Sequence, residues 1–90
     1  MSDPSYRRST DVLWRNVGWE VLVTRPDIET TEVLSQTTAE AWRLLEDPGT
    51  ALQIADRLEG FVGRADEIAV GVNALLIDLV RRGYCTHDDG

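Results

Sequence analysis

A change of hydrophobic period near Thr37 most constrains the fold of this 90-residue chain. Before this point, β-branched and aromatic residues gather in short runs, whereas after it the apolar residues recur at helical spacing. Because the connections between these segments are short, the sequence predicts a small antiparallel sheet followed by helices. A sheet of this size needs helices packed against it to be stable.

Three short strands are predicted before Thr37, at 11–16, 19–24 and 30–35. Gly18 lies between the first two runs, and we expect it to supply the positive φ of a tight hairpin turn. Pro26 and Asp27 predict the second turn, because proline fixes φ and aspartate bonds to its own backbone.

Three helices are predicted after Thr37, at 39–47, 51–60 and 65–82. Thr37 and Glu40 have the spacing of a capping box that opens the first helix. Thr50 is placed to cap the second helix, and Gly83 is expected to end the third. The predicted fold class is therefore α+β, with a winged helix-turn-helix-like order of three antiparallel strands followed by three helices.

The length and the charge restrict the class of protein. A chain of 90 residues is expected to form one domain, which we place at 11–86 between disordered tails at 1–10 and 87–90. Sixteen acidic and nine basic residues give a formal charge of −7, which repels nucleic acid and anionic membranes. No apolar run approaches the ~20 residues of a membrane span, and a lone cysteine suits a reducing compartment. The predicted location is the cytoplasm, without nucleic-acid or membrane partners.

Few residues are suited to catalysis or to metal binding. Cys85 and His87 are the only cysteine and histidine, and they lie close together near the C-terminus, where neither has an evident activating partner. A four-coordinate zinc site draws on more such residues than this. The glycines at 60 and 63 also lack the lysine of a phosphate-binding loop. We therefore predict no catalytic residue, no cofactor and no metal.

The helix predicted at 65–82 carries two apolar stripes. The first is an ordinary core face and comprises Ile68, Val72, Leu75, Leu76 and Leu79. The second lies on roughly the opposite side and comprises Val70, Ala74, Ile77 and Arg81, with Asn73 and Asp66 along its edge. Two interpretations of the second stripe are open from the residues alone. Either the sheet or the N-terminal tail covers it, or it lines a shallow groove beside an unpaired sheet edge.

The third predicted strand provides such an edge. Its residues Thr30, Thr31, Glu32 and Val33 favour a strand, and no proline interrupts them, so nothing in the strand prevents another chain from pairing with it. Glu32 is interpreted either as a gatekeeper against aggregation or as a contact for a basic residue of the paired chain.

The three tryptophans are assigned structural roles. Trp14 and Trp19 are expected to be core or hairpin-face residues, and Trp42 to lie in the core.

The stretch VLSQTTAEAWRLLED resembles the PqqD-like RiPP recognition elements, where RiPP denotes a ribosomally synthesised and post-translationally modified peptide. In that family a strand ending in Leu and a small polar residue precedes a helix with a Trp-x-Leu-Leu pattern. Those positions are here Leu34, Ser35, Trp42, Leu44 and Leu45. TALQIADRLEG and VNALLIDLVRRGYC resemble the family's second and third helices, so that the resemblance covers about 11–85. The sequence differs at Ser35, where Asn is frequent, and at Trp14 and Trp19, which the family does not require.

The resemblance implies a non-catalytic peptide chaperone that binds the leader segment of a precursor peptide. The leader would add as an antiparallel strand to the third strand and lie against the third helix, which is β-augmentation. The implied leader-binding residues are Thr30, Thr31, Glu32, Val33, Val70, Asn73, Ala74, Ile77 and Arg81. A separate modifying enzyme, namely a protease, a cyclase or a radical maturase, would act on the bound precursor.

Two other functions, and a dimeric state in place of a monomer, stay open at this stage. A winged-helix outline also occurs in DNA-binding regulators, although the helix at 51–60 and the start of the third helix carry more acid than base. The chain is otherwise interpreted as an adaptor that binds another protein without a peptide substrate. The open edge also allows a homodimer.

Overall fold

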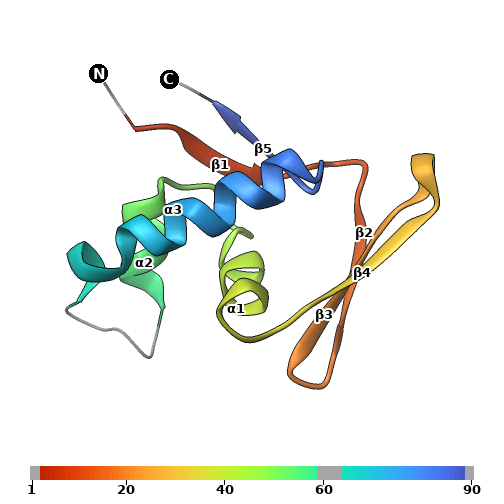
Figure 1. Ribbon diagram of the computed structural model, residues 1–90, viewed down its shortest axis with the longest axis horizontal. Helices are drawn as coiled ribbons and strands as arrows, with labels where there is room; N and C mark the ends of the chain where they lie inside the picture. The colour runs from red at the N-terminus through yellow and green to blue at the C-terminus, as the bar shows by residue number, and fades with distance from the viewer. Residues whose placement is uncertain (1–2, 59–63, 89–90) are drawn as a thin grey trace.

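Two small sheets and three helices make up the computed structural model, which describes residues 3–58 and 64–88 (Figure 1). In chain order the elements are β1 (Ser5–Arg8), β2 (Leu13–Val17), β3 (Glu20–Arg25), the 3-10 turn η1 (Pro26–Ile28), β4 (Thr30–Leu34), α1 (Gln36–Leu44), α2 (Ala51–Arg57), α3 (Ala65–Arg81) and β5 (Cys85–Asp88). The predicted α+β order of three strands followed by three helices is confirmed, and a terminal strand pair is added to it.

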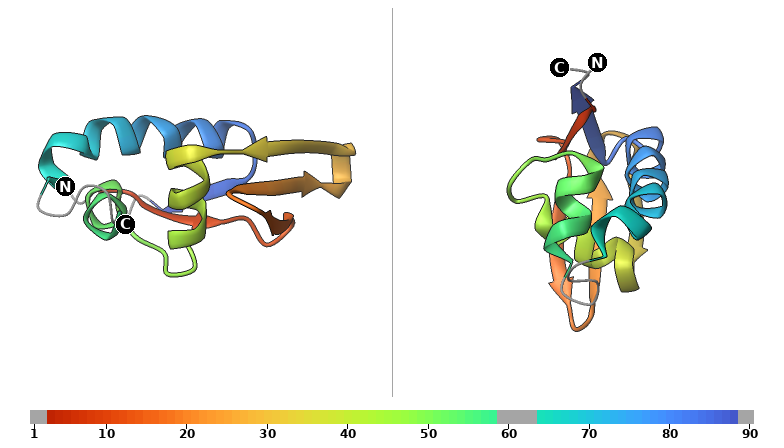
Figure 2. Two further views of the ribbon diagram at one scale, coloured as in Figure 1. Left: turned by 90° about the horizontal axis from the view of Figure 1, so that it is seen from below. Right: turned by 90° about the vertical axis from the view of Figure 1, so that its left-hand side faces the viewer.

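The larger sheet is antiparallel and has the order β2-β3-β4. Gly18 has a φ of 63°, as predicted for the turn that joins β2 to β3, and this left-handed backbone favours glycine. In the register of β3 and β4, Val21 pairs with Leu34. β4 is the last strand in the order and therefore forms one edge of the sheet. Figure 2 shows these strands projecting beyond the helices, so that much of β4 is not covered by them.

The helix boundaries follow local capping in one case and depart from the prediction in another. The Thr50 hydroxyl accepts a hydrogen bond from the Gln53 amide, and the Gln53 side chain accepts one from the Thr50 amide, so the predicted cap of α2 is confirmed. The capping box predicted for Thr37 and Glu40 is wrong, because α1 already begins at Gln36 with Ser35 at the N-cap. Thr37 is therefore inside the first turn. The predicted end of the second helix at residue 60 lies outside the described residues.

The segment predicted as an N-terminal tail contains β1, which pairs with β5 in a second sheet. Tyr6 is only 2% exposed, and its hydroxyl donates a hydrogen bond of 2.8 Å to Asn73 Oδ1 on α3. The Arg8 guanidinium donates to two backbone carbonyls at the end of α1. The prediction of disorder is therefore wrong for β1, and also for the part of the C-terminal tail that belongs to β5. Tyr6 is the one apolar residue among the four of β1, so the sequence shows no periodic pattern there. The strand is ordered by residues far along the chain, namely β5 and Asn73.

The core lies where the helices meet the inner face of the larger sheet. Its largest fully buried side chains are Trp42, Tyr84, Ile54, Leu58, Leu76, Leu79, Val21 and Val23. Trp42 is thus a core residue, as predicted. Trp14 on β2 packs edge-on against Trp42, with 6.1 Å between ring centroids, whereas Trp19 in the hairpin turn is 92% exposed. Within residues 3–58 and 64–88, no helix is both long and apolar enough to span a membrane.

Candidate functional site

The outer edge of β4 is a place at which another chain can join this fold, and β2 forms the other edge of the same sheet. β4 pairs with β3 on one side, and no described strand pairs with its other side. Val33 is 56% exposed and Thr31 is also exposed on the outer face of the strand, while Leu34 is buried on the inner face. An unpaired edge presents a row of backbone donors and acceptors, which is a template for a further strand.

Glu32, in the middle of β4, is held by groups of its own chain. Its carboxylate accepts a hydrogen bond from Arg82 at 3.3 Å, and Arg82 in turn pairs with Asp78 at 2.6 Å. Burial, followed by a hydrogen bond to Glu32, raises the pKa of Tyr84 to about 12. The inner side of β4 is thereby tied to the C-terminal end of α3. The Glu32 carboxylate is not free to pair with a ligand without giving up these partners.

A small cleft separates the end of β4 from α3. Its volume is about 200 Å³, and it is lined by Val33, Leu34, Ser35, Thr38, Leu75, Asp78 and Arg82. Leu75 is partly buried and packs against the core from this side. An extended peptide paired with β4 would lie beside this cleft and could place alternate side chains in it, because successive side chains of a strand point to opposite faces.

The residues predicted on α3 lie on a different flank of that helix. Val70 is 81% and Ile77 43% exposed, Ala74 and Arg81 are exposed as well, and Asn73 accepts the hydrogen bond from Tyr6. Val70, Asn73 and Ile77 line a second cavity, of about 350 Å³, that faces β1 and α2. The N-terminal strand thus covers only part of this stripe.

The structure therefore separates the predicted site residues into two places. Thr30, Thr31, Glu32 and Val33 form the β4 edge, whereas the five predicted α3 residues do not line the β4 cleft. The α3 residues that do line it are Leu75, Asp78 and Arg82. Leu75 was assigned to the core stripe and the other two were not singled out as site residues. Asp78 and Arg82 have opposite charges and are four residues apart, so the sequence indicates that they form an ion pair on one side of the helix. This spacing is the sequence signal by which the flank beside β4 could have been found.

Cys85 and His87, the two residues weighed for catalysis, lie on β5. Cys85 is buried, and this burial raises the pKa of its thiol to about 12, so that the thiol is protonated at neutral pH. A protonated thiol is a weak nucleophile and a poor metal ligand. In the described part of the chain no three His, Cys, Asp or Glu side chains form a group that could hold a metal ion.

A three-stranded antiparallel sheet followed by three helices, with its edge strand β4 beside α3, is the winged helix-turn-helix-like α+β fold that the sequence predicts. A solved structure with this fold is TbiB1 in complex with the TbiA(beta) leader peptide. The two structures superpose with a TM-score of 0.76 over 88% of this chain and 93% of that chain, at 18% sequence identity. The predicted fold class is thus confirmed by this likeness in structure. No family model and no curated protein sequence matches the chain.

Proposed function

We propose that this chain binds the leader segment of a RiPP precursor at the β4 edge and presents the precursor to a separate modifying enzyme. The observation that carries the proposal is the unpaired edge of β4 beside the α3 cleft, in a fold shared with a protein solved in complex with a leader peptide. The leader pairs antiparallel to β4 and thereby extends the three-stranded sheet to four strands.

Backbone hydrogen bonds supply much of the affinity in this mode of binding, and side-chain pockets supply the specificity. Alternate leader side chains point toward the cleft formed with Leu75, and the intervening ones lie on the outer face, where Thr31 is exposed. A cleft of about 200 Å³ admits individual side chains, and Ser35, Thr38, Asp78 and Arg82 give it a largely polar lining around Leu75, so the domain reads a short motif.

The chain itself is proposed to be non-catalytic and to act in the cytoplasm. Its buried thiol is protonated at neutral pH, and an unpaired cysteine suits a reducing compartment. Its contribution to the reaction is effective concentration, because a bound leader makes modification of the attached core peptide nearly intramolecular. The enzyme served is a protease, a cyclase or a radical maturase.

Backbone methylation of the leader tests this mode of binding directly. Fluorescein-labelled synthetic peptides that cover the N-terminal halves of short reading frames near the gene are first screened by fluorescence polarisation. A peptide that binds is then remade in two series, with N-methyl groups on odd or on even residues. Because only alternate residues of an antiparallel strand hydrogen-bond to one neighbour, one series should bind at least about tenfold more weakly and the other should bind normally. Equal effects in both series would exclude strand addition at β4.

A further inference from the structure

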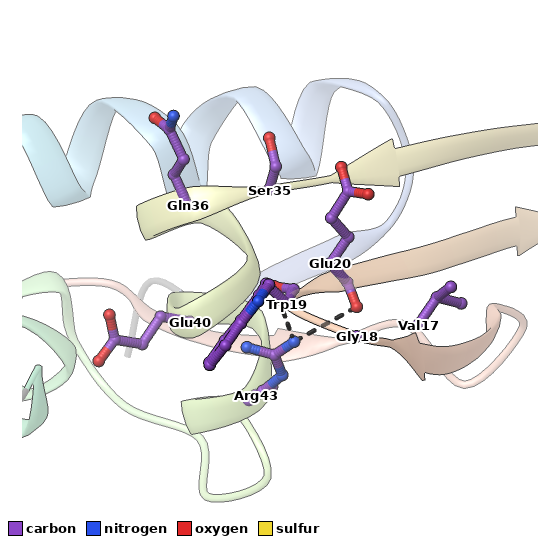
Figure 3. A pocket seen from close by; sticks show the side chains of 8 residues that line it. All are labelled: Val17, Gly18, Trp19, Glu20, Ser35, Gln36, Glu40 and Arg43. Carbon is purple, nitrogen blue, oxygen red and sulfur yellow. Dashed lines mark hydrogen bonds between the residues drawn. The ribbon is translucent and has the colours of Figure 1, made fainter.

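A third cavity of the protein lies at the end of the sheet where β4 passes into α1 (Figure 3). Its volume is about 900 Å³, and its walls include Trp19 and Glu20 of the β2–β3 hairpin together with Ser35, Gln36, Glu40 and Arg43. It shares with the β4 cleft only Ser35, so it is a separate space at the exit of the same strand.

Trp19 provides an aromatic wall of this cavity and does not pack in the core. The side chain is 92% exposed, although tryptophan is usually well buried. It stands in a two-residue turn between Val17 and Glu20, where Gly18 holds the left-handed backbone. Figure 3 shows the indole projecting from this turn beside α1. The tight turn therefore fixes the backbone that carries the ring, and the faces of the ring are in solvent.

Arg43 is the basic residue of this cavity, and its guanidinium is already bonded. Its Nε donates to Asn16 Oδ1 at 2.7 Å, and its Nη2 donates to the carbonyls of Trp19 and Glu20 at 3.1 and 3.3 Å. These bonds fasten the hairpin turn to α1. They direct the positive charge of Arg43 to backbone and amide oxygens and not to the neighbouring carboxylates.

Glu20 and Glu40 line the cavity without a cationic partner. Each of the five ion pairs found among residues 3–58 and 64–88 involves other carboxylates. An aromatic face and two unneutralised carboxylates around one space are the features that attract a cationic side chain, through cation–π and charge-assisted hydrogen bonds.

We propose that this cavity binds an arginine side chain of the leader, placed N-terminal to the segment that pairs with β4. This inference rests on the proposed function. A strand antiparallel to β4 enters beside Leu34, and two or three extended residues, at about 3.3 Å each, reach past Ser35 and Gln36 to the cavity. Arginine fits better than lysine, since its planar group can stack on the indole of Trp19 while it donates to a carboxylate.

The first experiment uses the full-length protein and a small probe. The Trp19 indole N–H resonance is followed by NMR during titration with N-acetyl-arginine amide and, as the neutral isostere, N-acetyl-citrulline amide. The arginine probe should give a saturable shift, and the citrulline probe should not. Glu40→Gln should weaken the arginine response roughly three- to tenfold, whereas Glu46→Gln, at an exposed carboxylate outside the cavity, should leave it unchanged. Equal responses to both probes would overturn the proposal.

The second experiment places the cation on the leader itself. A peptide that passes the methylation test is extended at its N-terminus, and arginine or citrulline is placed at each of the four added positions in turn. At one position arginine should bind roughly three- to tenfold tighter than citrulline, and Glu40→Gln should remove this difference. Identical affinities at all four positions would overturn the proposal even though leader binding stands. If no peptide binds at β4, the proposed function fails, while the probe titration still reports whether the cavity selects arginine.

Discussion

Two substitutions, two residues apart on different sides of α3, decide on which flank of the helix the leader lies. Leu75 lines the cleft beside β4, whereas Ile77 lines the cavity that faces β1 and α2. Leu75→Ala removes three carbons, which are worth up to about 2.4 kcal/mol when fully covered, at about 0.8 kcal/mol each. Because Leu75 is already partly buried in the free domain, a bound leader covers roughly half of this surface. We therefore expect a loss of about 1 kcal/mol, or roughly fivefold in affinity.

Ile77→Ala is the matched control, since it also truncates a branched apolar side chain on α3. It should leave the leader affinity within about twofold, because the 43% exposed side chain lines the other cavity and not the β4 cleft. Affinity is measured by fluorescence polarisation, and both variants are melted by circular dichroism so that binding losses are not confused with unfolding. If Ile77→Ala weakens binding and Leu75→Ala does not, the leader lies along the stripe of Val70 and Ile77 and the placement beside β4 is refuted.

Four further outcomes are expected. The free energy of unfolding in urea should fall between pH 9 and 12, because the raised pKa values of Cys85 and Tyr84 favour the unfolded state once it can lose these protons. Cys85→Ala should remove the part of the fall that begins near pH 9, and a free energy that stays constant over this range would contradict the burial of both groups. Gly83→Ala should destabilise the domain by about 1 to 2 kcal/mol, because the φ of Gly83 is 85° and a Cβ there would meet the Arg25 guanidinium. Gly71→Ala should instead raise the melting temperature, because a Cβ at this helical position would meet open space. In a gel-shift assay at physiological salt, the protein should not retard duplex DNA, and a sequence-selective shift would revive the regulator hypothesis. Sedimentation velocity at micromolar concentration should give a monomer, and a dimer that dissociates when leader is added would show that two copies share the β4 edge.

Features that depend on a few neighbouring residues were predictable from the sequence. Gly18 and Gly83 have the positive φ expected of them, because no other residue adopts that backbone so readily. Thr50 caps α2 through a hydroxyl three residues from its partner amide. The start of α1 was misplaced because three consecutive positions, Ser35, Gln36 and Thr37, offer similar polar side chains, and no side-chain bond selects among them.

Features that depend on distant parts of the chain were not predictable in the same way. β1 is ordered by β5, some eighty residues further along, and by the hydrogen bond from Tyr6 to Asn73. The two apolar stripes of α3 were found correctly, since Val72 and Leu76 are buried and Val70 is exposed. A helical period gives the angle of each side chain about the axis, but it does not say which flank the sheet approaches. The sequence alone therefore does not decide between the predicted flank of Val70 and Ile77 and the flank of Leu75 and Asp78 that lies beside β4.

The position of Glu32 also bears on why an open edge would accept a peptide in preference to a second copy. In the antiparallel register that pairs all five residues of β4 with those of another β4, Glu32 is the central residue and lies opposite its own copy. Like charges directly opposite in a sheet are destabilising, and each carboxylate would also have to keep its bond to Arg82 beside the other. A leader strand can place an uncharged residue at that position and retain every backbone hydrogen bond. The same side chain that fastens β4 to α3 thus selects against symmetric pairing, which leaves the edge open to the proposed leader strand.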